Sequence, residues 1–268
     1  MSSPADASPR ESLSVWADSW EEVSYRVIAA HSATPVVRDL VLAPAAASLQ
    51  HVAGQYLLLS DVDHRLPERS YSIANAPRQD RWLRLLITRY GAGRTSTWAH
   101  DDLRPGDEVA VSGPFGTFTL SDAHDGPVLL LAAGSGLAPL AALAQELLTG
   151  SRPVTLIFSG RTRADVIDRA RYLRLASQHA RFDYRYLLTR PRGEPRAPRL
   201  PECLASLLPE PDLSGWEVFT AGPGDFVSDA SRAALDLGAA RAAVHGEEFF
   251  ADPTPWGTAA PEPTERAR

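Results

Sequence analysis

Apolar residues in the first half of the chain come in short runs that turn-forming residues interrupt. Short runs closed by Gly, Pro, Asn or Asp are typical of β-strands joined by tight turns. The pattern predicts one short helix over residues 96–103 and strands over residues 24–30, 36–43, 55–60, 69–75, 82–90 and 108–112. A series of this kind predicts an antiparallel β-barrel.

In the second half, apolar runs alternate with segments of helical periodicity. We expect strands over residues 128–133, 154–158, 183–189, 217–220 and 239–245, separated by helices over 139–148, 163–179, 201–208 and 225–237. Such alternation predicts an α/β Rossmann-like, parallel five-stranded sheet with covering helices. Ligands of such sheets bind at the carboxyl ends of the strands.

The change of pattern between residues 122 and 127 marks the expected domain boundary. We expect a barrel domain over residues 20–122 and an α/β domain over residues 123–250. The flanking segments 1–19 and 251–268 lack periodic apolar positions. We therefore expect both of them to be disordered.

Composition narrows the possible functions. The 268 residues carry a formal net charge of −6, and no basic stripe is visible, so we expect no nucleic-acid partner. The longest apolar run stops at Gly134–Gly136, too short to cross a bilayer, and the N-terminus lacks the order of a signal peptide. These features predict a cytoplasmic protein without membrane association, either a monomer or a weak oligomer.

Cysteine and histidine usage argues against metal chemistry in this chain. The single cysteine, Cys203, excludes an internal disulfide and also an iron–sulfur cluster bound by this chain alone, which would need four ligands. The seven histidines show no metal-ligand spacing. The carboxylates Asp61, Asp63 and Glu68 fit a solvated surface better than a cation site. We expect no metal.

A first motif, Arg69-Ser70-Tyr71-Ser72, lies on a predicted strand. Arg69 and Tyr71 share one face of that strand, and the two serines share the other. By spacing alone this is an ordinary strand with a surface arginine. The same residues could also offer a flavin an aromatic plate, a hydroxyl near N5 of its ring and a cation for its pyrophosphate.

Two further segments join glycines to the start of a predicted helix. The stretch 91–97 holds Gly93, Thr95, Ser96 and Thr97. It can be a simple turn with a helix cap or a phosphate seat at a helix N-terminus. The stretch 131–139 holds Gly134, Ser135, Gly136 and Pro139 directly after a buried strand, the context that a dinucleotide-binding turn requires.

In this order and at this separation, the three segments resemble the ferredoxin–NADP reductase superfamily, and the resemblance spans roughly residues 20–250. It implies that the barrel binds FAD and that the α/β domain binds NAD(P)H. Tyr71 would pack on the isoalloxazine, Ser72 would lie near N5, and Arg69 would meet the pyrophosphate. The predicted FAD-binding set also includes Gly93, Ser96, Thr95, Thr97 and Arg89.

The resemblance extends to the end of the second domain. Gly134, Ser135, Gly136 and Pro139 match the family's nucleotide loop, with Ser135 in place of a threonine. Gly222 and Pro223 match the Gly-Pro of a late Cys-Gly-Pro motif, but Ala221 replaces its cysteine, which predicts slower hydride transfer rather than inactivity. Glu247 and Phe249 match a terminal Glu-x-aromatic motif. Ser72, Glu247 and Phe249 are the predicted catalytic residues.

Two arginines indicate the coenzyme. Arg161 follows the second strand of the α/β domain, and Arg190 follows the third. Guanidinium groups bind phosphate in a bidentate manner, so these residues favour NADPH, with NADH possible. Solvated arginines at strand ends are nearly as common.

The resemblance therefore implies a stand-alone flavoprotein reductase without an iron–sulfur domain. Such a protein passes hydride from NAD(P)H to FAD and electrons to a separate acceptor, such as a ferredoxin or an oxygenase component. Two alternatives stay open. One is a free-flavin or ferric reductase that uses a small diffusible acceptor. The other is a redox-inactive nucleotide-binding interaction module. Ala221 is the only feature of the sequence that favours this alternative.

Overall fold

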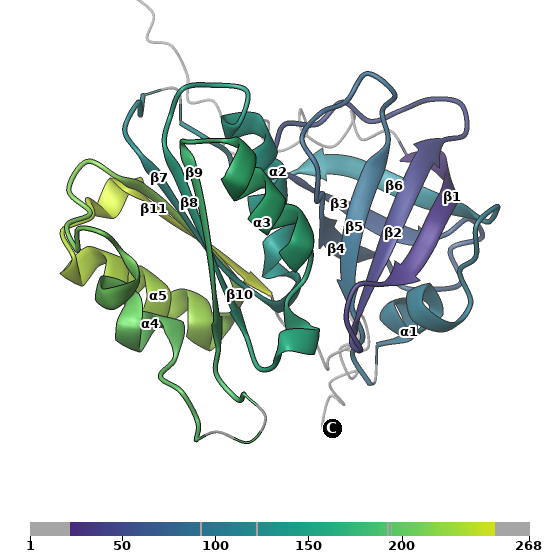
Figure 1. Cartoon of the computed structure of the whole chain (residues 1–268). Helices are drawn as coiled ribbons and strands as arrows, with labels where there is room; N and C mark the ends of the chain where they lie inside the picture. The colour runs from purple at the N-terminus through teal and green to yellow at the C-terminus, as the bar shows by residue number, and fades with distance from the viewer. Residues whose placement is uncertain (1–21, 92, 122, 192, 194, 250–268) are drawn as a thin grey trace, which may run out of the picture.

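The structure is a computed structural model that describes residues 22–91, 93–121, 123–191, 193 and 195–249. The terminal segments expected to be disordered lie outside these described residues. The described chain forms two β-sheets with helices α2 (Leu137–Leu147) and α3 (Arg169–Gln178) between them (Figure 1). None of the helices in this part of the chain has the length and apolar character needed to cross a bilayer.

The first sheet is the expected antiparallel barrel. It has six strands in the order β4-β3-β6-β1-β2-β5. A bridge between Ile73 and Leu85 joins its two edges. Helix α1 (Arg94–Asp101) follows β5. The strands are β1 (Glu22–Ser32), β2 (Val37–Pro44), β3 (Tyr56–Asp61), β4 (Arg69–Ser72), β5 (Leu83–Thr88) and β6 (Glu108–Phe115).

Alternation of buried and exposed positions builds the barrel interior, most clearly in β1. In β1, Val23, Tyr25 and Val27 are buried, whereas Ser24 and Arg26 between them are exposed. Successive side chains of a strand point to opposite faces, so one face of each strand supplies the core and the other meets solvent. The short apolar runs between turn residues predicted an antiparallel barrel, and the sheet order confirms it.

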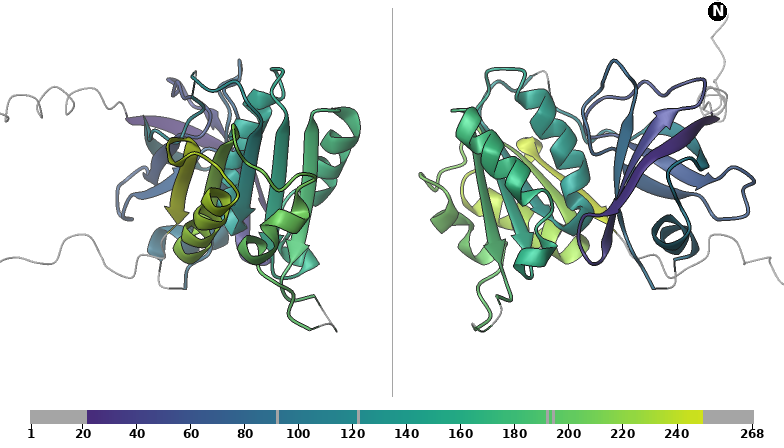
Figure 2. Two further views of the ribbon diagram at one scale, coloured as in Figure 1. Left: turned by 90° about the vertical axis from the view of Figure 1, so that its left-hand side faces the viewer. Right: turned by 45° about the vertical axis from the view of Figure 1, so that its right-hand side comes forward.

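The second sheet is parallel throughout, in the order β11-β10-β7-β8-β9. Its strands are β7 (Val128–Ala133), β8 (Val154–Gly160), β9 (Phe182–Leu188), β10 (Glu217–Pro223) and β11 (Val244–Phe249). Helices α4 (Leu200–Cys203) and α5 (Gly224–Asp236) cover the face turned away from the barrel, as the side views of Figure 2 show. Both faces are buried, which explains the continuous apolar runs of its central strands.

The two sheets share one apolar cluster. Val128, Leu130 and Ala132 of β7 pack with α2, while Leu129 and Leu131 pack on the opposite face with α5. The first of these clusters also takes in four barrel residues, Val37, Ala53, Ala74 and Leu86. The barrel and the parallel sheet are therefore packed against each other through α2.

Three predicted elements differ from those observed. The helix expected over 163–179 begins only at Arg169, because Asp168 has a φ of 52° and interrupts it. The strand expected over 239–245 is β11, which begins at Val244 after a 3₁₀ turn at Arg241–Ala243. Alanine is a weak strand former, so its Ala-rich start does not pair. The helix expected over 201–208 is the short α4 followed by a 3₁₀ turn, Leu204–Leu207.

Candidate cofactor site between the two sheets

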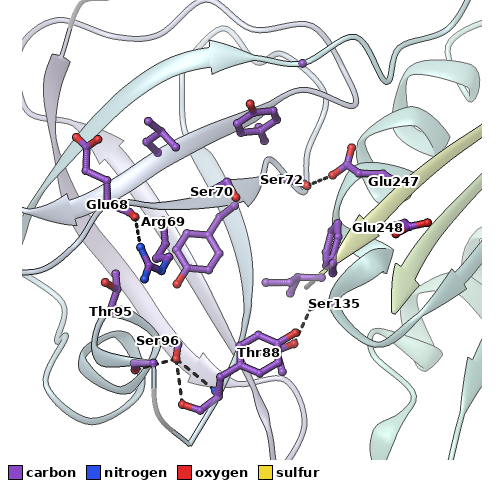
Figure 3. A pocket seen from close by; sticks show the side chains of 18 of the residues that line it. Glu68, Arg69, Ser70, Ser72, Thr88, Thr95, Ser96, Ser135, Glu247 and Glu248 are labelled. Carbon is purple, nitrogen blue, oxygen red and sulfur yellow. Dashed lines mark hydrogen bonds between the residues drawn. The ribbon is translucent and has the colours of Figure 1, made fainter. Parts of the chain in front are cut away.

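A cavity of about 1280 Å³ opens where the barrel meets the carboxyl end of the parallel sheet. Strands β4 and β5 and the start of α1 form its barrel side, and β11 with the loop after β7 forms the other side (Figure 3). A volume of this size suits a large cofactor. The cavity brings together nine of the predicted site residues: Arg69, Tyr71, Ser72, Gly93, Thr95, Ser96, Ser135, Glu247 and Phe249.

The first motif presents its residues as the strand pattern predicts. Tyr71 lines the cavity and packs against the barrel core, and burial raises the pKa of its phenol well above the usual range. The Arg69 guanidinium donates to the carbonyl oxygen of Glu68 at 2.9 Å. Ser72, on the opposite strand face, is buried at the junction of the two sheets. All three residues therefore border one cavity from a single short strand.

Helix α1 points its N-terminus at this cavity. Gly93 is its N-cap, and no side chain caps it, so the first-turn N–H groups lack an intrahelical acceptor. The hydroxyls nearby are already engaged: Thr95 Oγ1 donates to the carbonyl of Pro67 at 2.5 Å, and Ser96 Oγ donates to that of Gly93 at 3.1 Å. A Cβ at Gly93 would lie 2.6 Å from Ser96 Oγ. The backbone N–H groups, rather than the hydroxyls, are thus available to a phosphate.

The glycine loop after β7 contacts both strand β10 and the barrel. Gly134 has a φ of 57°, in the left-handed region. A Cβ at Gly136 would lie 2.2 Å from the carbonyl oxygen of Ala221, so only glycine lets this loop pack against the late Gly222 segment. Ser135 Oγ accepts a hydrogen bond from Thr88 Oγ1 at 2.7 Å. The predicted nucleotide loop and the barrel therefore meet at the cavity wall.

Strand β11 supplies the last wall of the cavity. Ser72 Oγ donates to Glu247 Oε1 at 2.5 Å, which links β4 to β11. Burial raises the pKa of Glu247, and the hydrogen bond from Ser72 opposes that rise only in part. Phe249 and Glu248 line the same wall. Two of the predicted catalytic residues are therefore in direct contact.

The predicted coenzyme arginines lie side by side. Arg161 follows β8 and Arg190 follows β9, and the Arg190 backbone N–H donates to the Arg161 carbonyl at 2.8 Å. Both residues are exposed, beyond the lining of the cavity. They sit at the carboxyl edge of the sheet, the edge at which ligands of such sheets bind.

The other predicted residues lie outside the cavity lining. Arg89 forms a two-point ion pair with Asp101 at 2.7 and 2.6 Å, and Thr97 lines a neighbouring shallow cleft. Gly134 and Gly136 belong to the glycine loop, Pro139 to the first turn of α2, and Gly222 and Pro223 to the end of β10 next to the loop. Ala221 is fully buried, so the position at which the family carries a thiol does not face the cavity.

Several lining residues were not predicted. Tyr56, Thr88, Tyr90 and Glu248 border the cavity from strand positions or strand ends, and burial raises the pKa of Tyr90. Tyr56 and Tyr90 carry no local motif. The one feature of the sequence that could have indicated these two residues is that they are tyrosines, because aromatic side chains are common in cofactor sites.

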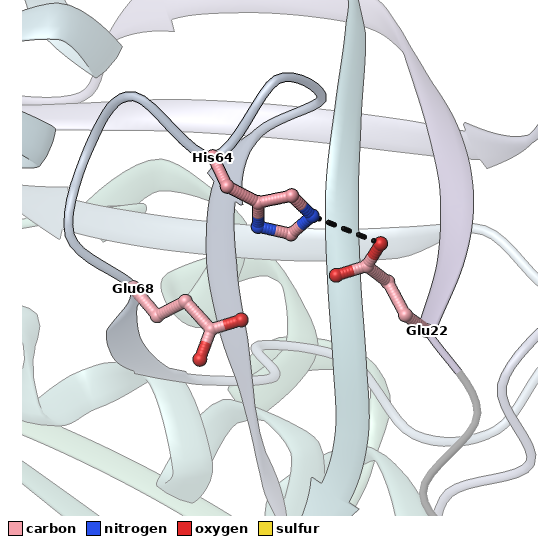
Figure 4. Close-up of side chains that lie close together, drawn as sticks. All are labelled: Glu22, His64 and Glu68. Atoms are coloured by element: carbon pink, nitrogen blue, oxygen red, sulfur yellow. Dashed lines mark hydrogen bonds and ion pairs between the residues drawn. The ribbon is translucent and has the colours of Figure 1, made fainter.

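A cluster of ligand-type side chains, Glu22, His64 and Glu68, lies beside the barrel, although no metal site was expected (Figure 4). Their nearest ligand atoms are all within 4.8 Å of one another, and His64 Nε2 is 3.2 Å from Glu22 Oε1. All three side chains are exposed. Exposed acidic groups of this kind are common without a bound ion, so we assign no metal role to this cluster.

Comparison with known proteins agrees with this architecture. The oxidoreductase FAD-binding domain family matches residues 27–120, and the oxidoreductase NAD-binding domain family matches residues 130–231. A flavohemoprotein of Pseudomonas aeruginosa is 32% identical over 202 residues, 73% of this chain and 50% of that protein. The reductase subunit of an aromatic O-demethylase from Amycolatopsis is 33% identical over 222 residues, 80% of this chain and 66% of that protein.

Solved structures show the same two-sheet arrangement. The Amycolatopsis reductase GcoB superposes with a TM-score of 0.78 at 29% identity, covering 86% of this chain and 70% of that one. The FAD/NAD-binding domain of a nitric oxide dioxygenase from Vibrio cholerae superposes with a TM-score of 0.73, covering 85% of this chain and 98% of that one. At its 23% identity, that likeness shows the fold alone. This chain spans between about half and two-thirds of the curated relatives named above.

Proposed function

The chain belongs to the ferredoxin–NADP reductase superfamily, with an FAD-binding domain followed by an NAD-binding domain, and from this premise we propose that it transfers hydride from NADPH to FAD and then electrons to a separate acceptor. The observation that carries the proposal is the contact between Ser72 and Glu247 inside the cavity. It places polar groups from the two binding units at one point, where the two ring systems must meet.

The barrel side fits a bound FAD. An uncapped helix N-terminus at Gly93 and the Arg69 guanidinium offer positive charge to a pyrophosphate. Tyr71 offers an aromatic face for the isoalloxazine, and burial keeps its phenol protonated. When bound, FAD supplies the hydride-accepting N5 and the capacity to release electrons one at a time. The chain's own task is to orient this ring and to exclude water from it.

The parallel-sheet side fits a dinucleotide. The loop at Gly134–Gly136 lies at the carboxyl end of β7, against Gly222 at the end of β10. Arg161 and Arg190 lie further along the same edge. Positions 161 and 190 are arginines rather than the acidic residues that bind the ribose hydroxyls of NADH, and paired guanidinium groups favour the extra phosphate of NADPH. These features support NADPH as the preferred coenzyme.

Ser72 and Glu247 would make the polar contacts at the reacting atoms. In the described structure the Ser72 hydroxyl hydrogen points to Glu247, so the Ser72 oxygen keeps its lone pairs for an N–H donor. The raised pKa of Glu247 makes a proton available there near neutral pH more readily than on an exposed glutamate. Phe249, on the same strand, would cover the ring from the opposite side to Tyr71.

The acceptor is proposed from the relatives. A further one is named as the ferredoxin reductase component of a 3-ketosteroid-9-alpha-monooxygenase from Mycolicibacterium smegmatis, 32% identical over 209 residues. Because such relatives are components of oxygenase systems, a ferredoxin or an oxygenase component is our first choice as acceptor for this chain. We also propose the boundary between the two binding units within residues 116–127, the segment that joins β6 to β7.

A visible spectrum of the purified protein tests the proposal. We expect flavin absorption that bleaches on addition of NADPH under anaerobic conditions and returns on addition of an oxidised ferredoxin. A colourless protein that takes up no added FAD would overturn it. Re-oxidation by free flavin or ferric chelates, but by no ferredoxin or oxygenase component, would favour a reductase with a small diffusible acceptor.

A further inference from the structure

Arg84 of β5 binds carboxylates from both halves of the molecule. Its Nε lies 3.0 and 3.1 Å from the two carboxylate oxygens of Asp39, and its Nη2 lies 2.6 Å from Oδ2 of that residue. Asp39 belongs to the neighbouring barrel strand β2. The remaining nitrogen, Nη1, donates to Asp168 at 2.6 Å, and Asp168 precedes helix α3 of the parallel-sheet half. One guanidinium therefore joins the two halves.

These three groups are shielded from solvent. The exposed fractions of the side chains are 13% for Arg84, 4% for Asp39 and 22% for Asp168. Burial opposes ionisation of Arg84, but the hydrogen bonds to Asp39 and Asp168 outweigh it and raise the pKa of the guanidinium. Charges are weakly screened at such a position. Separating the two halves would break the Arg84–Asp168 contact at this weakly screened position, so the ion pair between them resists separation.

Asp168 adopts a costly local arrangement. Its φ is 52°, in the left-handed region that is unfavourable for a residue with a side chain. It is also the N-cap of α3, where aspartate ordinarily accepts a hydrogen bond from the first turn, yet its side chain makes no cap bond. The carboxylate points to Arg84 instead. Strain that persists in a folded protein often marks a functional position.

Arg84 is held firmly on the barrel side and lies in line with the cavity. Its backbone N–H donates to Asn75 Oδ1 at 2.6 Å, and its carbonyl accepts from Ala74 at 2.7 Å. Residues two apart on a strand share a face, so Arg84, Leu86 and Thr88 face the parallel-sheet half together. Leu86 lines the cavity, and Thr88 bonds the nucleotide loop at Ser135.

We propose that the Arg84–Asp168 ion pair is a positioning device that sets the parallel sheet at the distance and angle from the barrel that hydride transfer requires. This inference rests on the proposed function. Neither residue lines the cavity, so both act through the placement of other groups. The reason for such a device is geometric: reacting atoms must approach to about 3–3.5 Å, and a displacement of about 1 Å can cost a hundredfold in rate.

Asp168→Asn is the decisive variant. Asparagine keeps the shape of the side chain and tolerates a positive φ, but it removes the charge that faces Arg84. We expect the rate of flavin reduction at saturating NADPH to fall by about tenfold to a hundredfold. The dissociation constants for FAD and for NADP⁺ should change much less than this rate, because neither Arg84 nor Asp168 lines the cavity. The long-wavelength charge-transfer absorbance between reduced flavin and NADP⁺ should weaken in parallel.

Two further variants separate orientation from stability. Arg171 lies 3.7 Å from Asp168 on the exposed face of α3, so Arg171→Gln should leave the reduction rate unchanged. Asp39→Asn removes the charge of the carboxylate by which the barrel itself binds Arg84. It should lower the thermal midpoint and slow the reduction less than Asp168→Asn does. Small-angle X-ray scattering measures the placement of the two halves without any turnover. The radius of gyration of the cofactor-free Asp168→Asn protein should exceed that of the unmodified protein.

The possible outcomes are distinct. A slower reduction with much smaller changes in the affinities and a larger radius of gyration supports the inference. An Asp168→Asn protein that matches the unmodified protein in rate, absorbance and scattering overturns it. So does one whose rate falls only because FAD is lost, because the ion pair would then act on flavin binding rather than on the approach of the coenzyme. If the unmodified protein is not reduced by NADPH, the proposed function fails, and scattering alone still decides whether the pair sets the relative placement of the two halves.

Discussion

The hydroxyl oxygen of Ser72 lies 2.5 Å from a carboxylate oxygen of Glu247, although the two residues are 175 positions apart in the chain. Ser72 ends strand β4 of the barrel, and Glu247 lies in β11 at the edge of the parallel sheet. The contact is made inside the cavity. The ionisation of the half-buried Glu247 therefore depends on the contact between the two sheets.

Glu247→Gln should make folding stability less sensitive to pH. Burial raises the pKa of Glu247 above its unfolded value, so the folded state favours the protonated acid. The stability that this group contributes is complete below the unfolded pKa and is lost as pH rises through the folded pKa. The variant should therefore unfold at higher urea than the unmodified protein near pH 8 and at equal urea near pH 3.5. An equal midpoint at both pH values would contradict the buried-acid assignment.

Tyr71→Ala should purify with little flavin. The ring of Tyr71 lines the cavity beside Arg69, and loss of an aromatic stacking partner costs about 1–3 kcal/mol, or about fivefold to 150-fold in affinity. Fluorescence titration with FAD measures this loss. Tyr71→Phe keeps the ring and is the matched control, for which we expect nearly full flavin content. An undiminished yellow colour in the alanine variant would refute the role.

Gly136→Ala should disrupt the nucleotide loop. The added Cβ would lie 2.2 Å from the Ala221 carbonyl oxygen, and overpacking against backbone costs about 1–3 kcal/mol or more. We expect weak NADPH binding with retained FAD, measured by coenzyme titration of the yellow protein. Gly150→Ala, in the turn after α2, is the control, because a Cβ there meets only the Leu147 carbonyl oxygen, at 3.6 Å. Equal coenzyme affinity in the two variants would count against the close contact.

Arg190→Ala should weaken NADPH more than NADH. Loss of a charged hydrogen bond costs about 1.5–3 kcal/mol, so the Michaelis constant for NADPH should rise at least about tenfold, while that for NADH should change little. Steady-state kinetics with both coenzymes measure the ratio. Arg241→Ala, an exposed arginine in the turn before β11, is the control and should change neither constant. Equal effects on both coenzymes in the Arg190 variant would exclude a phosphate contact.

The sequence predicted those features that depend on local pattern. The strand β7, Val128–Ala133, coincides with its predicted range because a continuous apolar run between turn residues admits few other structures. The antiparallel barrel and the parallel five-stranded sheet are both confirmed. The cavity residues Arg69, Tyr71 and Ser72 could be named in advance only because three segments together resemble a known family; by spacing alone they indicate an ordinary strand.

Features that depend on distant partners could not be predicted. Asp168 lies in a stretch that is helical by periodicity, and its carboxylate binds Arg84, 84 positions earlier. Thr88 reaches Ser135 across 47 positions. The residues around these two pairs have no composition or spacing that would predict either contact. Likewise, nothing near residue 221 indicates that the side chain there turns into the core rather than the cavity.

The single bridge between Ile73 and Leu85 closes the barrel at its weakest seam, and Ser72, Leu86 and Thr88 beside this seam border the cavity. A flavin bound there would contact both β4 and β5 where these two strands stop pairing with each other. Part of its binding free energy would then hold the barrel shut. Preparations stripped of flavin should accordingly exchange their β4 and β5 amide hydrogens faster, and refilling the cavity should restore protection there before any coenzyme is added.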